Sequence, residues 1–153
     1  MLPLFMNLTD RHVVVVGGGR VATRRVLALL AEGANVAVVA PWVSEELQRL
    51  ELAASISWER REYRKGDVAA AWLVVAATDN AAVNELVAAE AAASRIWCVR
   101  SDAHADSSAW MAASAGFDDV TVAVSAHGDP RRAVAVRDAI LEQLESGALQ
   151  AER

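Results

Sequence analysis

The stretch VVVVGGGRVATRR, from Val13 to Arg25, decides the fold of this chain. Its four valines in a row are typical of a strand that is buried on both faces of a parallel sheet. Residues 20–32 then show apolar side chains at helical spacing, and Gly33 follows as a helix stop. Three glycines, at 17–19, separate the strand from the helix. The stretch therefore predicts a βα unit whose turn can bring its backbone close to a ligand.

Apolar segments continue to alternate with helical ones over about the first 100 residues, which is typical of βαβ units. We expect further strands within Asn35–Pro41, Ser55–Arg60, Ala71–Thr78 and Arg95–Arg100. One helix is expected to start at Ser44, with Leu47, Leu50 and Leu52 partly inward, and another to run from Asn80 to Ser94. The pattern predicts an α/β fold, a Rossmann-like doubly wound parallel sheet.

The pattern changes after residue 100. Two extended segments, Ala109–Ala113 and Val120–Ser125, follow without a helix between them and are predicted to pair antiparallel. Asp129 and Pro130 then begin an amphipathic helix that runs to about Glu145, with proline at the first helical position. We expect an NAD-binding Rossmann domain at 1–108, and a small segment at 109–153 with two strands and a C-terminal helix. The open edges of those strands predict pairing with a second copy.

The composition excludes several classes of protein. A net charge of -5 argues against a nucleic-acid partner, because phosphate binding needs a basic face. No apolar run approaches the roughly 20 residues of a membrane span. The start MLPLFMNLTDR lacks the basic region of a signal peptide, so we expect a cytoplasmic protein. The single cysteine, Cys98, forms no internal disulfide and is predicted to be a small buried hydrophobe.

The glycine turn fits the dinucleotide fingerprint G-x-G-x-x-A with Gly17, Gly19 and Ala22. Gly17 permits the tight turn, Gly19 lets the backbone approach a pyrophosphate, and Ala22 lets the helix pack close to the strand. The helix N-terminus adds N–H donors and a partial positive charge. The alternative is a tight βα turn in a fold that binds no nucleotide.

The acidic residue that usually binds the ribose at the end of the second strand is missing, and Pro41 and Trp42 stand there instead. The choice between NAD and NADP is therefore not readable from this position. Trp42 either contacts the adenosine half or is a partly buried loop aromatic. At the end of the fourth strand, Thr78 and Asp79 either contact the ligand or cap the following helix.

Four stretches together carry a family resemblance: LPLFMNLTDRHVVVVGGGRVATRR, AWLVVAATDNAAVN, WCVRSDAHADSSAWM and VTVAVSAHGDPRRAVAVRDAIL. Through them the chain resembles the precorrin-2 dehydrogenase family, the N-terminal domain of siroheme synthases. The resemblance covers Leu2 to Leu144. It implies oxidation of precorrin-2, a tetrapyrrole, to sirohydrochlorin with NAD, joined in some members to ferrous iron insertion. It also implies a homodimer that is formed by the segment after the Rossmann domain.

The resemblance assigns the catalytic role to Asp102. A carboxylate that is partly shielded from water can have a raised pKa, so we expect Asp102 to act as a general base or to position the macrocycle. The residues that the resemblance places against the cofactor are Gly17, Gly18, Gly19, Arg20, Val21, Pro41, Trp42 and Thr78. Where family members often have asparagine shortly before the aspartate, this chain has Val99, Arg100 and Ser101.

A macrocycle fringed with carboxylates needs cations around its rim. The last third of the chain gathers candidates that are otherwise solvated surface residues: Arg100, His104, His127, Arg131, Arg132 and Arg137. Asp102, His104 and Asp106 would point the same way in an extended segment. They form either a metal site or a polar loop in which Asp102 works alone; we favour the loop and assign no metal.

The competing class of function for the whole chain is a non-enzymatic dinucleotide sensor.

Overall fold

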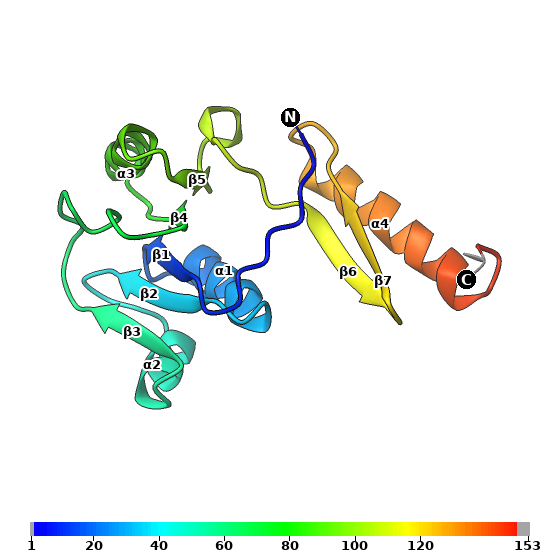
Figure 1. Cartoon of the computed structure of the whole chain (residues 1–153), viewed down its shortest axis with the longest axis horizontal. Helices are drawn as coiled ribbons and strands as arrows, with labels where there is room; N and C mark the ends of the chain where they lie inside the picture. Colours follow the sequence, from blue (N-terminus) through cyan, green and yellow to red (C-terminus); the bar gives the residue numbers. More distant parts are fainter. Residues whose placement is uncertain (1, 150–153) are drawn as a thin grey trace. The chain divides into compact units, whose positions relative to one another are not determined.

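A computed structural model of the chain describes residues 2–149 (Figure 1). The chain forms two compact units, Met1–Ala109 and Trp110–Arg153. Among the described residues, no helix is long and apolar enough to cross a membrane.

The first unit is a five-stranded parallel sheet with helices between its strands (Figure 1). Its strands are β1 His12–Val16, β2 Asn35–Val39, β3 Ile56–Glu59, β4 Leu73–Ala76 and β5 Trp97–Arg100, and its helices are α1 Arg20–Ala31, α2 Glu45–Leu52, α3 Ala81–Ala93 and the 3-10 turn η1 His104–Asp106. The strand order is β3-β2-β1-β4-β5. The chain moves outward from β1 to β3 and then returns to the other side of β1, so the topological switch point lies between β1 and β4. The predicted doubly wound sheet is confirmed.

The core explains why β1 reads as an unbroken apolar run. Val14 and Val16 belong to a buried cluster with Val87 and Ala91 of α3. Val13 and Val15 point to the opposite face of the sheet because side chains alternate along a strand, and they are also fully buried. A strand that is covered on both faces has no position for a polar side chain.

Side-chain caps fix the starts of α2 and α3. Ser44 caps α2 as predicted, its hydroxyl accepting from the Leu47 N–H at 3.3 Å. Leu47 is buried, but Leu52 is 82% exposed, so the prediction that Leu52 faces inward was wrong. Leu52 is the last residue of the helix. The cap of α3 is Asn80, so neither Thr78 nor Asp79 has the capping role.

The second unit is an antiparallel hairpin packed against one helix. Its strands are β6 Ala113–Phe117 and β7 Val120–Val124, and its helix is α4 Pro130–Glu145. The Asp129 carboxylate caps α4 by accepting from the Arg132 N–H at 3.0 Å. The antiparallel pairing is confirmed, but the first strand lies at Ala113–Phe117 and not at Ala109–Ala113. Pairing of Phe117 with Val120 across a two-residue turn sets this register.

Candidate functional site

A cavity of about 540 Å³ lies across the carboxyl ends of the strands in the first unit. The segments that follow β1, β2, β3, β4 and β5 contribute residues 17–21, 40–42, 62–63, 77–80 and 101–102 to its walls. The switch point between β1 and β4 therefore lies in the middle of the cavity, the usual position of a ligand in an open α/β sheet.

The three glycines meet different demands. Gly17 has a φ of +123°, and a Cβ there would lie 2.4 Å from the Ala77 carbonyl oxygen. A Cβ on Gly18 would lie 2.0 Å from the Trp42 carbonyl oxygen. Close contact with neighbouring backbone carbonyl groups thus requires glycine at both positions. Gly19 has an ordinary φ of -82°, and a Cβ there would meet only the Trp42 ring, at 3.7 Å. Nothing within the chain requires Gly19 to be glycine.

The start of α1 presents its free amides to this open space. The first-turn N–H groups of a helix have no acceptor within the helix, and the N-cap Gly19 has no side chain to serve as one. Thr23 and Ser44 hold the turn in place: their hydroxyls lie 2.8 Å apart, and the Ser44 N–H donates to the Gly18 carbonyl at 2.9 Å. Arg20 adds a positive charge to the cavity wall. Together these features favour an anion such as a pyrophosphate.

One end of the cavity is aromatic and acidic. Trp42 is 62% exposed and lines the cavity, so it is not the partly buried loop aromatic of the alternative interpretation. Glu62 and Tyr63, from the loop after β3, also line the cavity, and sequence reasoning missed both. Glu62 follows β3, which lies beside β2, so it stands next to the strand end at which the usual acidic residue is missing.

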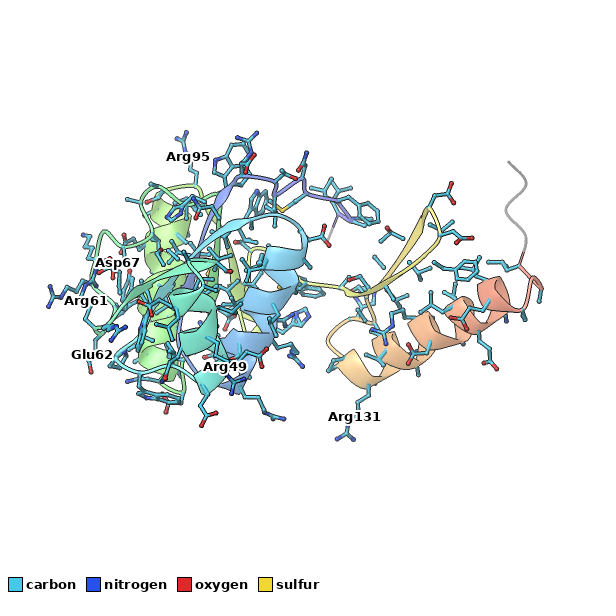
Figure 2. The ribbon with its side chains drawn as sticks, turned by 90° about the horizontal axis from the view of Figure 1, so that it is seen from below. Arg49, Arg61, Glu62, Asp67, Arg95 and Arg131 are labelled. Atoms are coloured by element: carbon cyan, nitrogen blue, oxygen red, sulfur yellow. The ribbon has the colours of Figure 1, made fainter. Side chains whose placement is uncertain are left out.

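The loop that carries these two residues is anchored on both sides. The Tyr63 hydroxyl donates to the Glu90 carboxylate of α3, and the Gly66 N–H donates to the same carboxylate at 2.8 Å. Arg61 forms a two-pronged ion pair with Asp67, at 2.8 and 2.9 Å. Figure 2 shows Arg61, Glu62 and Asp67 at one edge of the first unit. Burial raises the pKa of Tyr63, and hydrogen bonding to Glu90 raises it further, so the ring stays neutral.

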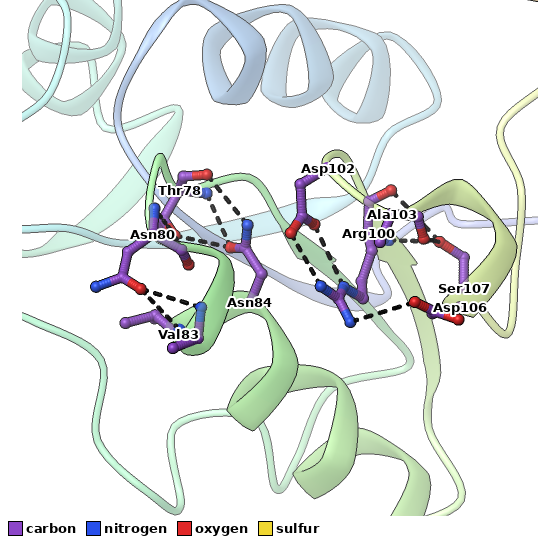
Figure 3. A network of polar contacts seen from close by, with 10 residues as sticks. Thr78, Asn80, Val83, Asn84, Arg100, Asp102, Ala103, Asp106 and Ser107 are labelled. Atoms are coloured by element: carbon purple, nitrogen blue, oxygen red, sulfur yellow. Dashed lines mark hydrogen bonds and ion pairs between the residues drawn. The ribbon is translucent and has the colours of Figure 1, made fainter.

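Asp102 lies at the other end of the cavity, paired with Arg100. The guanidinium donates to the two carboxylate oxygens at 3.3 and 2.9 Å (Figure 3). This pairing is the main cause that lowers the pKa of Asp102 below its ordinary value. The expectation of a raised pKa was therefore wrong, because the charge of Arg100 and its hydrogen bonds outweigh the partial burial of the carboxylate.

The DAHAD segment is not extended. Asp102 lies in a bend and His104–Asp106 form the 3-10 turn η1, so the three side chains do not share the same face of a strand. Asp106 lies 3.9 Å from Arg100 and is 70% exposed. Within residues 2–149, no group of three or more histidine, cysteine or acidic side chains is placed to hold a metal ion.

The predicted substrate-binding cations are divided between the units. Arg100 and His104 belong to the first unit, and His127, Arg131, Arg132 and Arg137 belong to the second. Arg100 is only 10% exposed and is engaged by Asp102. Arg137 forms an ion pair with Asp138, whereas Arg131 extends outward from the start of α4 (Figure 2). A role for these six residues in substrate binding stays a prediction.

Cys98 lies on β5 beside the site but does not open onto it. Its side chain is 2% exposed, and burial raises its pKa to about 11. A thiol in this state is a poor nucleophile. The prediction of a small buried hydrophobe is confirmed.

Comparison with known proteins places this fold and cavity in a family. A family model described as putative NAD(P)-binding matches residues 4–113. Precorrin-2 dehydrogenase of Bacillus subtilis is 38% identical over 128 residues, which is 84% of this chain and 78% of that protein. Siroheme synthase 3 of Aeromonas hydrophila is 39% identical over 127 residues, but the chain spans only 27% of its length. The solved structure of SirC, precorrin-2 dehydrogenase, matches 96% of this chain and 71% of its own, with a TM-score of 0.76 and 29% identity. The chain therefore belongs to the precorrin-2 dehydrogenase family.

Proposed function

We propose that this protein is an NAD-dependent dehydrogenase that oxidises precorrin-2 to sirohydrochlorin. One observation carries the proposal: a single cavity joins an unobstructed dinucleotide turn at Gly19 to an ionised aspartate at Asp102. The identity of the substrate is inferred from the family, and the cavity is a place where cofactor and substrate can meet.

The order of the strand ends along the cavity suggests in which direction the cofactor lies in it. The pyrophosphate fits at residues 17–21, where backbone amides and Arg20 face the cavity. The adenosine half fits toward Pro41, Trp42 and Glu62, and the nicotinamide half toward Thr78. When bound, NAD supplies the acceptor for the hydride. The Glu62 carboxylate at the adenosine end suits ribose hydroxyls and repels a 2′-phosphate, which favours NAD over NADP.

Asp102 contributes a fixed negative charge beside the nicotinamide end. Its lowered pKa keeps the carboxylate ionised at neutral pH, so it can accept a hydrogen bond from a pyrrolic N–H of the macrocycle. The same carboxylate can take the proton that leaves with the hydride, although a group of low pKa is a weak base. Asp102 can therefore serve both as the acceptor of that proton and as a group that positions the macrocycle.

The test is formation of NADH when precorrin-2 and NAD are mixed with the protein without oxygen. An enzyme produces NADH in proportion to the precorrin-2 consumed. A dinucleotide sensor, the competing class, would bind NAD but form no NADH, and that result would overturn the proposal.

We also propose that the protein is a homodimer joined through its second unit. A two-stranded hairpin is marginally stable alone, and β6 and β7 each leave an edge unpaired within the described sheet. Val134 and Val136 of α4 are 39% and 42% exposed, so a partner would also cover apolar surface there. Light scattering tests this assembly. Insertion of ferrous iron stays a prediction of the family resemblance.

A further inference from the structure

Asn84, in the first turn of α3, has the least exposed polar side chain among the described residues. It is 0% exposed, and the other buried polar residue of this set, Thr23, lies on α1. A buried amide without partners destabilises a fold by several kcal/mol, of the order of 2 to 7. An apolar residue could occupy the same buried position of the helix without this cost. The presence of asparagine there therefore indicates that its hydrogen bonds have a role.

Three hydrogen bonds join Asn84 to Thr78 of the cofactor cavity. The Asn84 Oδ1 accepts from the Thr78 N–H at 3.1 Å and from the Thr78 hydroxyl at 2.8 Å, and the Asn84 Nδ2 donates to the Thr78 carbonyl at 3.1 Å (Figure 3). The amide thus fixes the backbone of Thr78 on both sides and its side chain as well. Asn84 itself does not line the cavity.

The same amide lies beside the catalytic end of the site. Asn84 is one of the side chains that lower the pKa of Asp102, after the pairing with Arg100. Figure 3 shows Asn84 between the Thr78 loop and the Arg100–Asp102 pair. The three hydrogen bonds to Thr78 use both acceptor positions of the Asn84 amide and one of its two donors.

We propose that Asn84 is a positioning residue that fixes the Thr78 loop beside Asp102, so that cofactor and substrate meet correctly. The inference rests on the proposed function for its catalytic meaning. Its structural part, the fixing of the Thr78 loop by Asn84, does not depend on the identity of the substrate.

The expected effects separate positioning from stability. Removing the amide frees Thr78, so NAD affinity should fall about tenfold, equivalent to about 1.4 kcal/mol. Turnover at saturating NAD should fall about tenfold or more, because the freed Thr78 loop no longer holds the cofactor in a fixed place beside Asp102. The titration midpoint of Asp102 should rise. The other charged groups that act on this midpoint are Arg100, with Asp106 and Glu85 acting through Arg100.

The experiment compares Asn84→Ala with Val87→Ala in the full chain. Val87 is equally buried on the same helix, packs in the core and does not line the cavity, so its truncation destabilises without touching the site. Carbon-13 NMR follows the Asp102 carboxyl through a pH titration, and calorimetry gives the NAD affinity. Asn84→Ser, which keeps a hydroxyl, replaces Asn84→Ala if the latter does not fold.

The proposal requires that the Asn84 variant alone raises the Asp102 midpoint and weakens NAD binding. An Asp102 midpoint that stays at the wild-type value in the Asn84 variant, or that moves equally in Val87→Ala, overturns it. Failure of the proposed function is a different result: wild-type protein would form no NADH from precorrin-2, whereas the titration and the calorimetry would still report on Asn84.

Discussion

Replacement of Gly19 by valine separates what the fold needs from what the cofactor needs. The backbone at Gly19, with φ -82° and ψ -171°, is open to any residue. A Cβ there would meet only the Trp42 ring, at the ordinary contact distance of 3.7 Å. The expected loss of stability is that of an apolar residue at a helix N-cap, about 1 kcal/mol.

The expected loss of NAD affinity is much larger. A side chain at residue 19 fills the space in which the turn and the first amides of α1 would meet a phosphate. Each hydrogen bond to a charged group contributes about 1.5 to 3 kcal/mol. If two are lost, binding weakens by about 3 kcal/mol or more, which lowers the affinity at least about 100-fold.

Calorimetric titration with NAD and thermal unfolding, measured together, test both expectations. Gly18→Ala is the matched control, since its Cβ would lie 2.0 Å from the Trp42 carbonyl oxygen and 2.8 Å from the Val43 Cα. That variant should lose stability through the clash, whereas Gly19→Val should stay folded and bind NAD poorly. Wild-type NAD affinity in Gly19→Val would refute the assignment of the pyrophosphate to this turn.

Four further outcomes are expected. Asp102→Asn should lower NADH formation by about 10² to 10⁴ while Asp106→Asn stays within a few fold of wild type, and the reverse ranking would mean that the wrong carboxylate has been assigned. Arg100→Gln removes the main cause that lowers the pKa of Asp102, so the acid limb of the pH–rate profile should move to higher pH. Glu62→Gln should raise the NADP affinity relative to NAD in competition binding, and an unchanged ratio would exclude Glu62 as the selecting residue. Light scattering should give a dimer, and deletion of the chain after residue 109 should give a monomer.

The sequence predicted the centre of the sheet because β1 and β4 are covered on both faces. Such strands are continuous runs of valine and alanine, and the caps at Ser44 and Asp129 are local signals that need no tertiary context. The strand at Ala113–Phe117 was displaced in the prediction because Ser114 and Gly116 carry little strand propensity. Their place in the hairpin comes from pairing with β7, which is not a property of the segment alone.

The site could be predicted only where a motif carries it. The glycine turn, Trp42 and Thr78 line the cavity; the glycine motif selected the turn, and the family resemblance selected Trp42 and Thr78. Tyr63 was missed because its position depends on an anchor in another element, Glu90 of α3. The pKa of Asp102 was predicted in the wrong direction because composition does not show which cation a carboxylate will meet.

The Arg100–Asp102 pair changes how both residues can act on a polyanionic substrate. Arg100 is engaged by Asp102 and is 10% exposed, so it cannot serve as a free anchor for a substrate carboxylate without breaking that pair. Breaking the pair would remove the main cause that lowers the pKa of Asp102. The two residues therefore act as one unit that presents a carboxylate acceptor, so Arg100 is the weakest of the six predicted substrate-binding cations. Arg131 and Arg132 stay the stronger candidates of that prediction, because both are exposed and both lie in the first turn of α4, where the helix dipole adds to their charge.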